Sequence, residues 1–535
     1  MDFNYFNYPF NSQRNVVFAQ NGIVATSQYL AAEAGLEILK IGGNAVDAAI
    51  ATAACLTVTE PTSNGIGGDA FAIIWMNNSM YGLNSSGPAP KNLNISKVKD
   101  MGHTSIPQYG WVPVTVPGIP AAWGELSAKF GSLSLTKVLE PAINYAQNGF
   151  PVSTVVSYNW NKIAKLYKET LKDSIYKEWF NIFTSDGNAP NPGDIWRSSD
   201  LAETLCSIAK SNGKSFYSGN LAEKIIDFSN KTGGFLNNID LEEYQPEWVT
   251  PISINYRGYD IWELPPNGQG LVALLALNIL NKFDLEKATD NELIHKQIEA
   301  IKLGFADGFK YIADPKYMQI DLTTILSDNY SQEKAKQISN FANKPEKINP
   351  YSGGTVYLAT ADKFGNMVSY IQSNYRGFGS GLVVPGTGIA LHNRGCGFTL
   401  DPNHPNCLSP GKRPYHTIIP GFITKDNKPI GPFGVMGALM QPQGHVQVIS
   451  NLLDKKLNQQ ASLDKPRWQW TRENHILVED IFESKSLSYL KSHGHNISIS
   501  TDTTSFGRGQ IIWKNSNDIY VAGTEPRADS TAASW

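Results

Sequence analysis

The order of helical and strand-like segments is the feature that most limits the folds open to this chain of 535 residues. Residues 120–345 are dominated by segments with apolar residues at helical spacing. These segments span residues 121–130, 135–148, 200–211, 221–229 and 291–309. From Tyr351 onward, β-forming residues prevail and the helical spacing is replaced by a hairpin pattern. Helices followed by strands, without the alternation of a βαβ protein, predict an α+β fold built in layers.

Length and composition narrow the class of protein. A chain of this length exceeds one ordinary core, so we expect two domains or one large layered domain. Hydrophobic residues make up 41% and charged residues 17%, which is typical of a globular protein. The formal net charge of −3 gives no electrostatic basis for binding nucleic acid or an acidic membrane surface.

The N-terminal residues, the lack of long apolar runs and the four cysteines predict where the protein is located and whether its thiols are reduced. The first residues lack the basic and apolar regions of a secretory signal, and no run of about 18 apolar residues occurs, so no spanning helix is expected. The four cysteines do not make a disulfide framework, and free thiols are expected, although Cys396 and Cys407 are close enough in sequence to pair. Together these features predict a cytoplasmic protein without membrane attachment.

A glycine-rich loop near the start of the chain invites comparison with nucleotide-binding motifs. Residues 26–58 predict two helices, the second capped by Asn44 and dense in alanine. Gly65-Ile66-Gly67-Gly68-Asp69 follows, and the strand-like residues 70–75 come next. A dinucleotide fingerprint needs a strand before the glycines and a helix after them. We therefore predict a tight loop with close backbone packing instead of a nucleotide site.

One short segment of the strand-rich half carries the candidate chemistry. Gly353-Gly354-Thr355 begins a predicted β-hairpin with strands at 355–362 and 367–373. If the chain is cut before Thr355, that residue carries a hydroxyl and a free α-amino group with a pKa of about 7.7–8.0. Nucleophile and base then come from one residue. Attack of the hydroxyl on the Gly354 carbonyl would make the cut, and glycine permits the required backbone distortion.

Ordered motifs along nearly the whole chain strengthen this hypothesis. They are Gly42-Gly43-Asn44-Ala45-Val46-Asp47-Ala48-Ala49, Glu60-Pro61, Gly65 to Asp69, Val116-Pro117-Gly118, Leu139-Glu140-Pro141-Ala142-Ile143, Gly149-Phe150-Pro151-Val152, Phe305-Ala306-Asp307, Gly386-Thr387-Gly388-Ile389 and Lys412-Arg413-Pro414. In this order and spacing they resemble the γ-glutamyltranspeptidase (glutathione hydrolase) family of N-terminal nucleophile hydrolases. Gln372-Ser373-Asn374-Tyr375 and Gln441-Pro442-Gln443-Gly444-His445 resemble its divergent, acylase-like branch.

The resemblance implies a fold and a maturation step. The expected fold is a four-layer α-β-β-α sandwich of the N-terminal nucleophile hydrolase type. Self-cleavage is expected to yield a large, helix-rich subunit of residues 1–354 and a small, strand-rich subunit of residues 355–535, which together form one intertwined catalytic domain. Association into a homo-oligomer is left open. The chemistry requires no cofactor and no metal, and His493 and His495 have no cysteine or carboxylate at ligand spacing.

The resemblance also implies catalytic residues. The nucleophile falls on Thr355, and a hydroxyl that hydrogen-bonds it falls on Ser373. Two adjacent backbone N–H groups that form an oxyanion hole fall at Gly437 and Ala438. A backbone donor tolerates alanine in place of glycine only where φ is negative, so Ala438 departs from the residue type expected at this position.

The residues expected to hold the substrate depart from the family pattern. In the family an arginine binds the γ-glutamyl α-carboxylate, and Ser86 occupies its position in this chain. Tyr375 stands at the position of the family's asparagine contact, and Gly397 at the position of the aspartate that meets the α-amino group. The family's serine pair falls on His416 and Thr417. Losing both charged partners removes interactions worth about 1.5–3 kcal/mol each.

Two neighbouring side chains have competing interpretations. Arg376 either binds an acidic substrate group or is a surface turn residue. His416 either contacts the substrate or is a hydrogen-bonded core histidine.

Three functions stay open from the sequence. The first is an N-terminal threonine amidohydrolase that passes an acyl group from a small-molecule amide to water or an amine, with glutathione or another γ-glutamyl amide as the substrate implied by the resemblance. The second is an N-acyl amide acylase of the same fold that does not recognise the γ-glutamyl α-amino and α-carboxyl groups. The third, a catalytically inert binding or scaffold protein, is disfavoured by the retention of Thr355 and Ser373.

Overall fold

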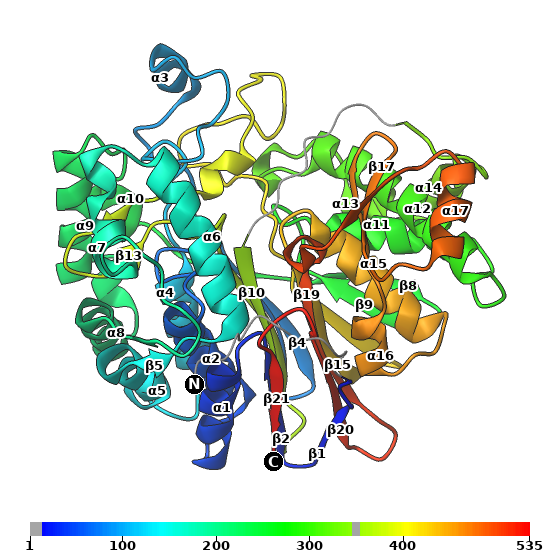
Figure 1. The fold of residues 1–535 in the computed structure, drawn as a ribbon, viewed down its shortest axis with the longest axis horizontal. Helices are drawn as coiled ribbons and strands as arrows, with labels where there is room; N and C mark the ends of the chain where they lie inside the picture. The colour runs from blue at the N-terminus through cyan, green and yellow to red at the C-terminus, as the bar shows by residue number, and fades with distance from the viewer. Residues whose placement is uncertain (1–12, 345–353) are drawn as a thin grey trace.

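Two antiparallel sheets of seven strands each lie face to face at the centre of the molecule (Figure 1). The computed structural model describes residues 13–344 and 354–535. Along the first sheet the strands are β21 (Thr531–Ser534), β2 (Gly22–Thr26), β10 (Gly354–Asp362), β11 (Met367–Tyr375), β3 (Asp69–Met76), β4 (Ser79–Ser85) and β7 (Glu247–Val249). Along the second they are β1 (Val17–Ala19), β20 (Tyr520–Thr524), β19 (Arg508–Lys514), β15 (Lys428–Met436), β14 (Gly421–Lys425), β9 (Tyr259–Glu263) and β8 (Ile252–Tyr256).

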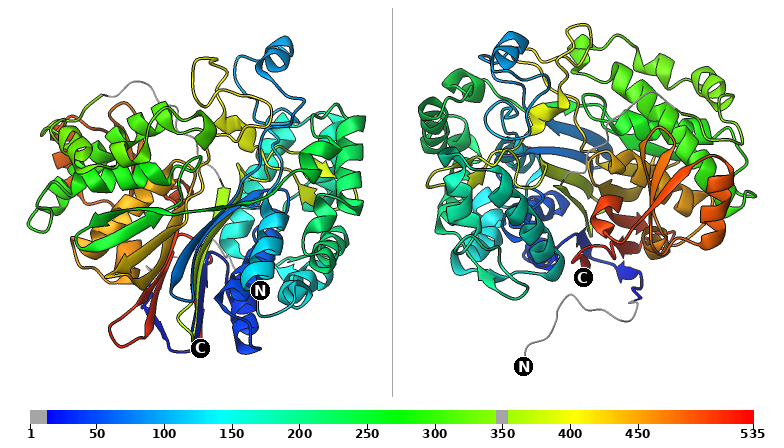
Figure 2. Two further views of the ribbon diagram at one scale, coloured as in Figure 1. Left: turned by 180° about the vertical axis from the view of Figure 1, so that it is seen from behind. Right: turned by 45° about the horizontal axis from the view of Figure 1, so that its top comes forward.

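Helices cover the outer face of each sheet. On the first sheet, α1 (Tyr29–Lys40) and α2 (Ala45–Thr59) pack against β2 and β10. On the second, α11 (Gly270–Leu280) packs against β8 and β9, and α15 (Met440–Leu453) packs against β15. The view from behind shows the order helix, sheet, sheet, helix (Figure 2). This arrangement confirms the predicted four-layer α-β-β-α sandwich.

The remaining elements build on these layers. The predicted helical segments are all helices, namely α4 (Ile119–Phe130), α5 (Leu135–Asn148), α8 (Ser199–Ser211), α9 (Asn220–Lys231) and α12 (Asp290–Tyr311). The other helices are α3 (Ile95–Asp100), α6 (Thr154–Thr170), α7 (Lys177–Phe183), α10 (Asn238–Glu242), α13 (Leu322–Ile325), α14 (Asp328–Ala335), α16 (Gln459–Asp464) and α17 (Ser484–Ser492). Short strands form small extra sheets: β5 (Phe150–Pro151) with β6 (Ile195–Trp196), β12 (Val383–Val384) with β13 (Ile389–Ala390), and β16 (Trp468–Arg472) with β17 (His475–Glu479) and β18 (Asn496–Ser500).

The local sequence explains how α2 is placed against the first sheet. Asn44 accepts the N–H of Asp47, and the Asp47 carboxylate accepts the N–H of Asn44, which makes a capping box at the start of the helix. Every residue of α2 is buried, and its many alanines allow close approach to neighbouring elements. Two further bonds tie this helix start to the end of β10. Thr360 Oγ1 donates to the Ala45 carbonyl (2.7 Å), and the Ala45 N–H donates to Asp362 (3.0 Å).

The space between the sheets is filled by apolar and aromatic side chains. Tyr357 of β10 faces β15, where Gly434 leaves room for its ring, because a Cβ at Gly434 would lie 2.4 Å from Tyr357 Cε2. The Tyr357 hydroxyl hydrogen-bonds Ser369 Oγ of β11 at 2.8 Å. This packing fixes the β10–β11 hairpin against β15, whose end leads into residues 437 and 438.

Two expectations from composition can be compared with the structure. The four cysteines are free, as predicted. Within residues 13–344 and 354–535, no helix combines the length and apolarity needed to cross a membrane.

Candidate active site

Thr355 is the second residue of β10, and its hydroxyl belongs to a short chain of hydrogen bonds. Thr355 Oγ1 donates to Ser373 Oγ (3.0 Å), and Ser373 Oγ donates to the carbonyl oxygen of Gly354 (2.8 Å). The N–H of Tyr375 donates to the same serine oxygen (2.7 Å). Thr355 is 1% exposed and Ser373 is fully buried. Two consecutive hydrogen bonds thus connect the candidate nucleophile, through the Ser373 hydroxyl, to the Gly354 carbonyl.

The register of the predicted hairpin, which the structure confirms, brings these groups together. Val356 pairs with Gln372 and Gly354 pairs with Tyr375, with a bulge between the two pairs. Tyr375 has a φ of +74°, a conformation that costs a side-chain-bearing residue about 1–3 kcal/mol. Gly354 packs tightly, because a Cβ at this position would lie 2.9 Å from Ser63 Cα. Packing therefore requires glycine before the candidate nucleophile.

The glycine-rich loop at residues 65–68 packs on the end of β11. A Cβ on Gly68 would lie 2.5 Å from the Ser373 carbonyl oxygen, and one on Gly67 would lie 2.4 Å from the Ala390 carbonyl oxygen. These contacts confirm the prediction of close backbone packing. The loop supports the strand that carries Ser373.

The loop between β15 and α15 presents the two predicted oxyanion-hole residues. Gly437 has a φ of +135° and Ala438 a φ of +50°, so the condition under which alanine is readily tolerated here, a negative φ, is not met. Alanine in this left-handed region costs about 1–2 kcal/mol. The Ala438 carbonyl accepts from Gln269 Nε2 (2.8 Å) and from the N–H of Gln441 (3.2 Å), which hold the residue in place. Among the described residues, neither the Gly437 N–H nor the Ala438 N–H has a hydrogen-bond acceptor.

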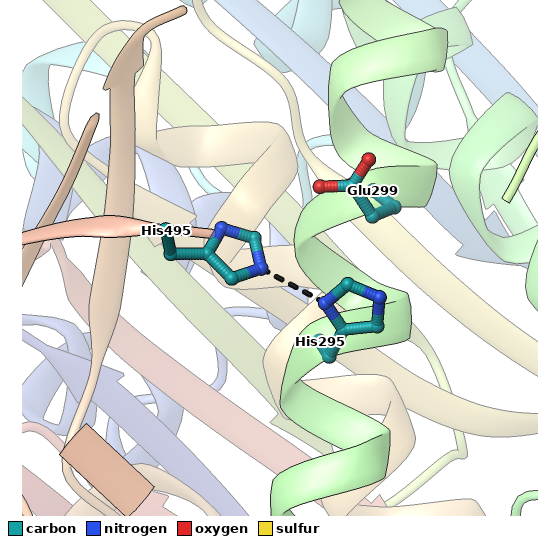
Figure 3. A group of neighbouring side chains, drawn as sticks. All are labelled: His295, Glu299 and His495. Atoms are coloured by element: carbon teal, nitrogen blue, oxygen red, sulfur yellow. Dashed lines mark hydrogen bonds between the residues drawn. The ribbon is translucent and has the colours of Figure 1, made fainter. Parts of the chain in front are cut away.

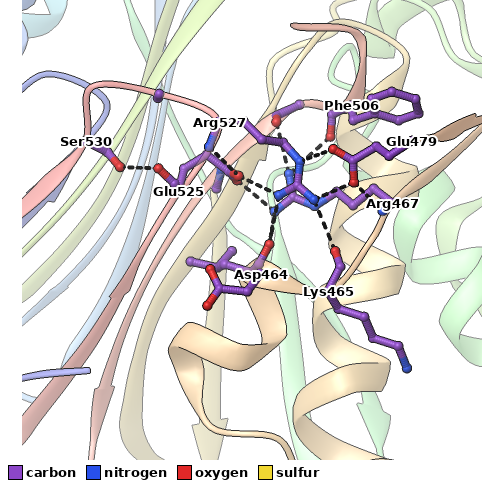
Figure 4. A network of polar contacts seen from close by, with 12 residues as sticks. Asp464, Lys465, Arg467, Glu479, Phe506, Glu525, Arg527 and Ser530 are labelled. Atoms are coloured by element: carbon purple, nitrogen blue, oxygen red, sulfur yellow. Dashed lines mark hydrogen bonds and ion pairs between the residues drawn. The ribbon is translucent and has the colours of Figure 1, made fainter. Parts of the chain in front are cut away.

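A buried ionic network holds a backbone segment on which this loop packs (Figure 4). Its charged members are Arg467, Glu479, Glu525 and Arg527. Two positive and two negative charges balance, as buried ion pairs require. Arg467 Nη1 also donates to the Gly507 carbonyl at 3.0 Å, and a Cβ on Gly437 would lie 3.1 Å from Gly507 Cα. The network therefore fixes the backbone against which Gly437 rests.

Ser86 and His416 lie in hydrogen-bonded networks of the core. Ser86 Oγ donates to Asn84 Oδ1 (2.7 Å) and accepts from Asn267 Nδ2 (3.3 Å). His416 is fully buried and bonds Asp69 Oδ2 through Nε2 (3.0 Å). The structure thus gives both residues protein partners.

The His416–Asp69 pair has a defined proton arrangement. The N–H of Ile418 donates to His416 Nδ1 (3.3 Å), so Nε2 carries the proton and donates to Asp69. Burial holds the pKa of His416 well below its usual value. Burial also raises the pKa of Asp69 to about 8, while the charge of Arg394 acts in the opposite direction. At neutral pH the His416–Asp69 pair therefore carries little net charge.

Comparison with known proteins identifies the family. The family model described as gamma-glutamyltranspeptidase matches residues 31–535. The chain belongs to the γ-glutamyltranspeptidase family. This assignment and the fold make the protein an enzyme of the N-terminal nucleophile hydrolase type.

Individual members of the γ-glutamyltranspeptidase family resemble this chain over nearly its full length. The glutathione hydrolase-like YwrD proenzyme of Bacillus subtilis is 36% identical, with 96% of this chain and 99% of that protein covered. The oxamate amidohydrolase proenzyme of Klebsiella pneumoniae is 30% identical, with 96% and 98% covered. The crystal structure of cephalosporin acylase from Bacillus halodurans is 55% identical, has a TM-score of 0.97 and covers 100% of this chain and 99% of that chain.

An arginine that the family resemblance did not select joins the predicted residues. Arg394 Nη1 donates to Thr417 Oγ1 (2.8 Å), and its guanidinium lies 4.2 Å from the centre of the Tyr375 ring. Arg376 lies at 5.3 Å from the same ring and donates to Gln108 Oε1 (3.0 Å). The Thr417 carbonyl accepts from Gln269 Nε2 at 2.6 Å. Because the same amide group also donates to the Ala438 carbonyl, the structure connects Arg394 with the loop of Gly437 and Ala438.

A separate cluster of metal-ligating residue types is formed by two residues of α12 and the residue that precedes β18 (Figure 3). The ligand atoms of His295, Glu299 and His495 lie within 4.8 Å of one another. His295 Nδ1 hydrogen-bonds His495 Nε2 (2.8 Å), and Glu299 accepts from Lys302 Nζ (2.7 Å) and from the N–H of Asn343 (3.0 Å). A metal ion here would replace the bond between the imidazoles and lie near the Lys302 charge. We therefore assign no metal to this family member.

Proposed function

We propose that the protein is a self-processing amidohydrolase in which Thr355 is the nucleophile. The observation that carries this proposal is the hydrogen-bond chain from Thr355 Oγ1 through Ser373 Oγ to the Gly354 carbonyl. Attack of Thr355 Oγ1 on the Gly354 carbonyl carbon forms an ester while the Gly354–Thr355 C–N bond breaks. Ser373 accepts from the attacking hydroxyl and donates to the carbonyl oxygen that becomes negative. Water then opens the ester and leaves a carboxylate on Gly354 and a free amine on Thr355.

The mature enzyme repeats this chemistry on a substrate. The α-amine of Thr355 takes the proton of its own hydroxyl, since its reference pKa of about 7.7–8.0 leaves part of it neutral near pH 7. The hydroxyl oxygen attacks the substrate carbonyl, the α-amine passes the proton to the leaving nitrogen as the C–N bond breaks, and an acyl ester remains on Thr355. Water or a second amine then removes the acyl group. The N–H groups of Gly437 and Ala438 serve as the oxyanion donors, a role for which they have no competing acceptor among the described residues.

The acyl donor is a γ-glutamyl amide such as glutathione or another small-molecule N-acyl amide. Membership of the family supports the first class. The second is favoured by a specific observation, namely that the positions of the family's charged glutamyl contacts hold Ser86 and Gly397, and the Ser86 hydroxyl is engaged by Asn84 and Asn267. The similarity to an oxamate amidohydrolase and a cephalosporin acylase also supports the second class.

Intact mass spectrometry tests the proposal. We expect the purified wild-type protein to consist of two chains that separate between Gly354 and Thr355, and Thr355→Ala to remain one chain. Thr355→Ser is a useful companion because it keeps the hydroxyl and should still be cut. A single full-length wild-type chain, or a Thr355→Ala chain cut at the same bond, would overturn the proposal.

A further inference from the structure

Arg394 is a buried cation with an incomplete set of partners. It is fully buried in the short helical turn of residues 394–397, and its Nη1 atom donates to Thr417 Oγ1. Its Nε and Nη2 atoms have no hydrogen-bond partner among residues 13–344 and 354–535. Over the same part of the chain Arg394 forms no ion pair, and the ion-pair contacts of the nearby Asp69 carboxylate are with His392 and His416. A buried guanidinium without a counter-ion is costly, so this arrangement requires an explanation.

The two unpartnered atoms belong to the same edge of the guanidinium group. In arginine, Nε–H and one N–H of Nη2 point in parallel, and this edge matches the two oxygens of a carboxylate. The Thr417 hydroxyl on Nη1 and the Tyr375 ring at 4.2 Å fix the plane of the group. The unoccupied edge of Arg394 is thus preorganised for bidentate binding of one carboxylate.

The neighbouring carboxyl group does not neutralise Arg394. Asp69 is engaged by His416 Nε2 (3.0 Å) and by the N–H of Gly87 (3.3 Å). Burial raises the pKa of Asp69 to about 8, so this carboxyl is poorly ionised at neutral pH. Burial lowers the pKa of Arg394 to about 10, which still leaves the guanidinium charged. A positive charge therefore remains available to a ligand.

Tyr375 connects Arg394 with the bond that is cut in the proposed self-cleavage. In self-cleavage the attacked carbonyl belongs to Gly354, so this residue marks where the acyl group of a later substrate begins. Gly354 pairs directly with Tyr375 across the hairpin, and Arg394 lies over the Tyr375 ring. Thr355, like Arg394, is buried in the uncut chain. The hairpin pairing therefore places Arg394 beside the residue that faces the acyl side of the proposed cleavage bond.

We propose that Arg394 binds a carboxylate carried by the acyl group, so that the preferred substrates are amides of short dicarboxylic acids. This assignment rests on the proposed function and specifies its substrate class. The residue that binds the substrate carboxylate would then lie in the segment after β13. Ser86 occupies the position at which the family has its carboxylate-binding arginine. No side-chain carboxylate replaces the family's aspartate at Gly397, so an α-amino group on the acyl chain is not required.

A pair of isosteric substrates tests the proposal on the wild-type enzyme. Glutaryl-p-nitroanilide carries a terminal carboxylate, and its terminal carboxamide has the same size without the charge. We expect kcat/KM to be about 10- to 100-fold higher for the carboxylate, the range for charge-assisted hydrogen bonds. Adding γ-glutamyl-p-nitroanilide shows whether an α-amino group improves turnover. Equal turnover of the carboxylate and the carboxamide would overturn the role of Arg394 while leaving the amidohydrolase function standing.

A binding measurement separates the two proposals. Titration calorimetry with glutarate, on the wild type and Arg394→Gln, reports carboxylate binding without any turnover. We expect affinity to fall about 10- to 100-fold in Arg394→Gln and to stay unchanged in Arg472→Gln, which alters an exposed arginine. If no anilide is hydrolysed but glutarate binding depends on Arg394, the site stands and the proposed function fails. If glutarate does not bind, or binds equally to both proteins, the site is refuted.

Discussion

Ser373→Ala removes a hydroxyl that links three groups at the proposed cleavage bond. In the structure, Ser373 Oγ accepts from Thr355 Oγ1 (3.0 Å) and from the N–H of Tyr375 (2.7 Å), and donates to the Gly354 carbonyl (2.8 Å). The last of these bonds strengthens as charge develops on the carbonyl oxygen. Loss of one such donor typically slows reaction by about 10²–10³-fold, or about 2.7–4 kcal/mol of transition-state stabilisation. We therefore expect self-cleavage to slow by that factor.

Cell-free synthesis followed by a time course of intact mass measures the cleavage rate directly. Ser373→Thr keeps the hydroxyl and should restore cleavage. Ser369→Ala is a matched control, because it removes a buried hydroxyl from the same strand that bonds Tyr357 instead (2.8 Å). Its cleavage rate should match the wild type. If Ser373→Ala is cut as fast as wild type, or Ser369→Ala is slowed equally, then the hydrogen-bond chain does not drive the reaction.

Three further predictions concern stability. Ala438→Gly should raise the free energy of unfolding by up to about 1 kcal/mol, because φ is +50° at this position, and a lower value by urea denaturation would contradict the assigned strain. Arg527→Met should lower the free energy of unfolding by about 3–5 kcal/mol, because Glu479 and Glu525 lose their shared cation. An unchanged melting temperature would refute this loss of stability. Asp69, whose pKa is raised to about 8 by burial, keeps a proton that the unfolded chain loses above about pH 4. Wild-type stability should therefore fall between pH 5 and about pH 8, and Asp69→Asn should flatten this decline in urea titrations at both pH values.

The sequence predicted those parts of the molecule in which local pattern decides the structure. The hairpin places Thr355 and Ser373, 18 residues apart, within hydrogen-bond distance. The predicted helix at 135–148 coincides with α5, an amphipathic helix. In contrast, α11 was not predicted, since all of its residues are buried and no polar face marks the helical period.

Long-range contacts explain what sequence patterns missed. His416 and Asp69 are separated by 347 residues, and His295 and His495 by 200, so no spacing rule connects them. Arg394 gains its significance only from the Tyr375 ring and the Thr417 hydroxyl, which come from different segments. The backbone angle of Ala438 likewise depends on the contacts of its loop and not on the preference of alanine.

If the chain is cut after Gly354, the two fragments stay associated, because strands from both fragments are neighbours in both sheets. In one sheet β10 and β11 lie between β2 and β3, and in the other β14 lies beside β9, so fragments from both sides of the cut alternate as hydrogen-bonded neighbours. Pulling the fragments apart would break ladder bonds in both sheets at once and expose the apolar layers between them. Dilution alone should therefore never separate them, and neither fragment synthesised alone has the strands needed to complete either sheet.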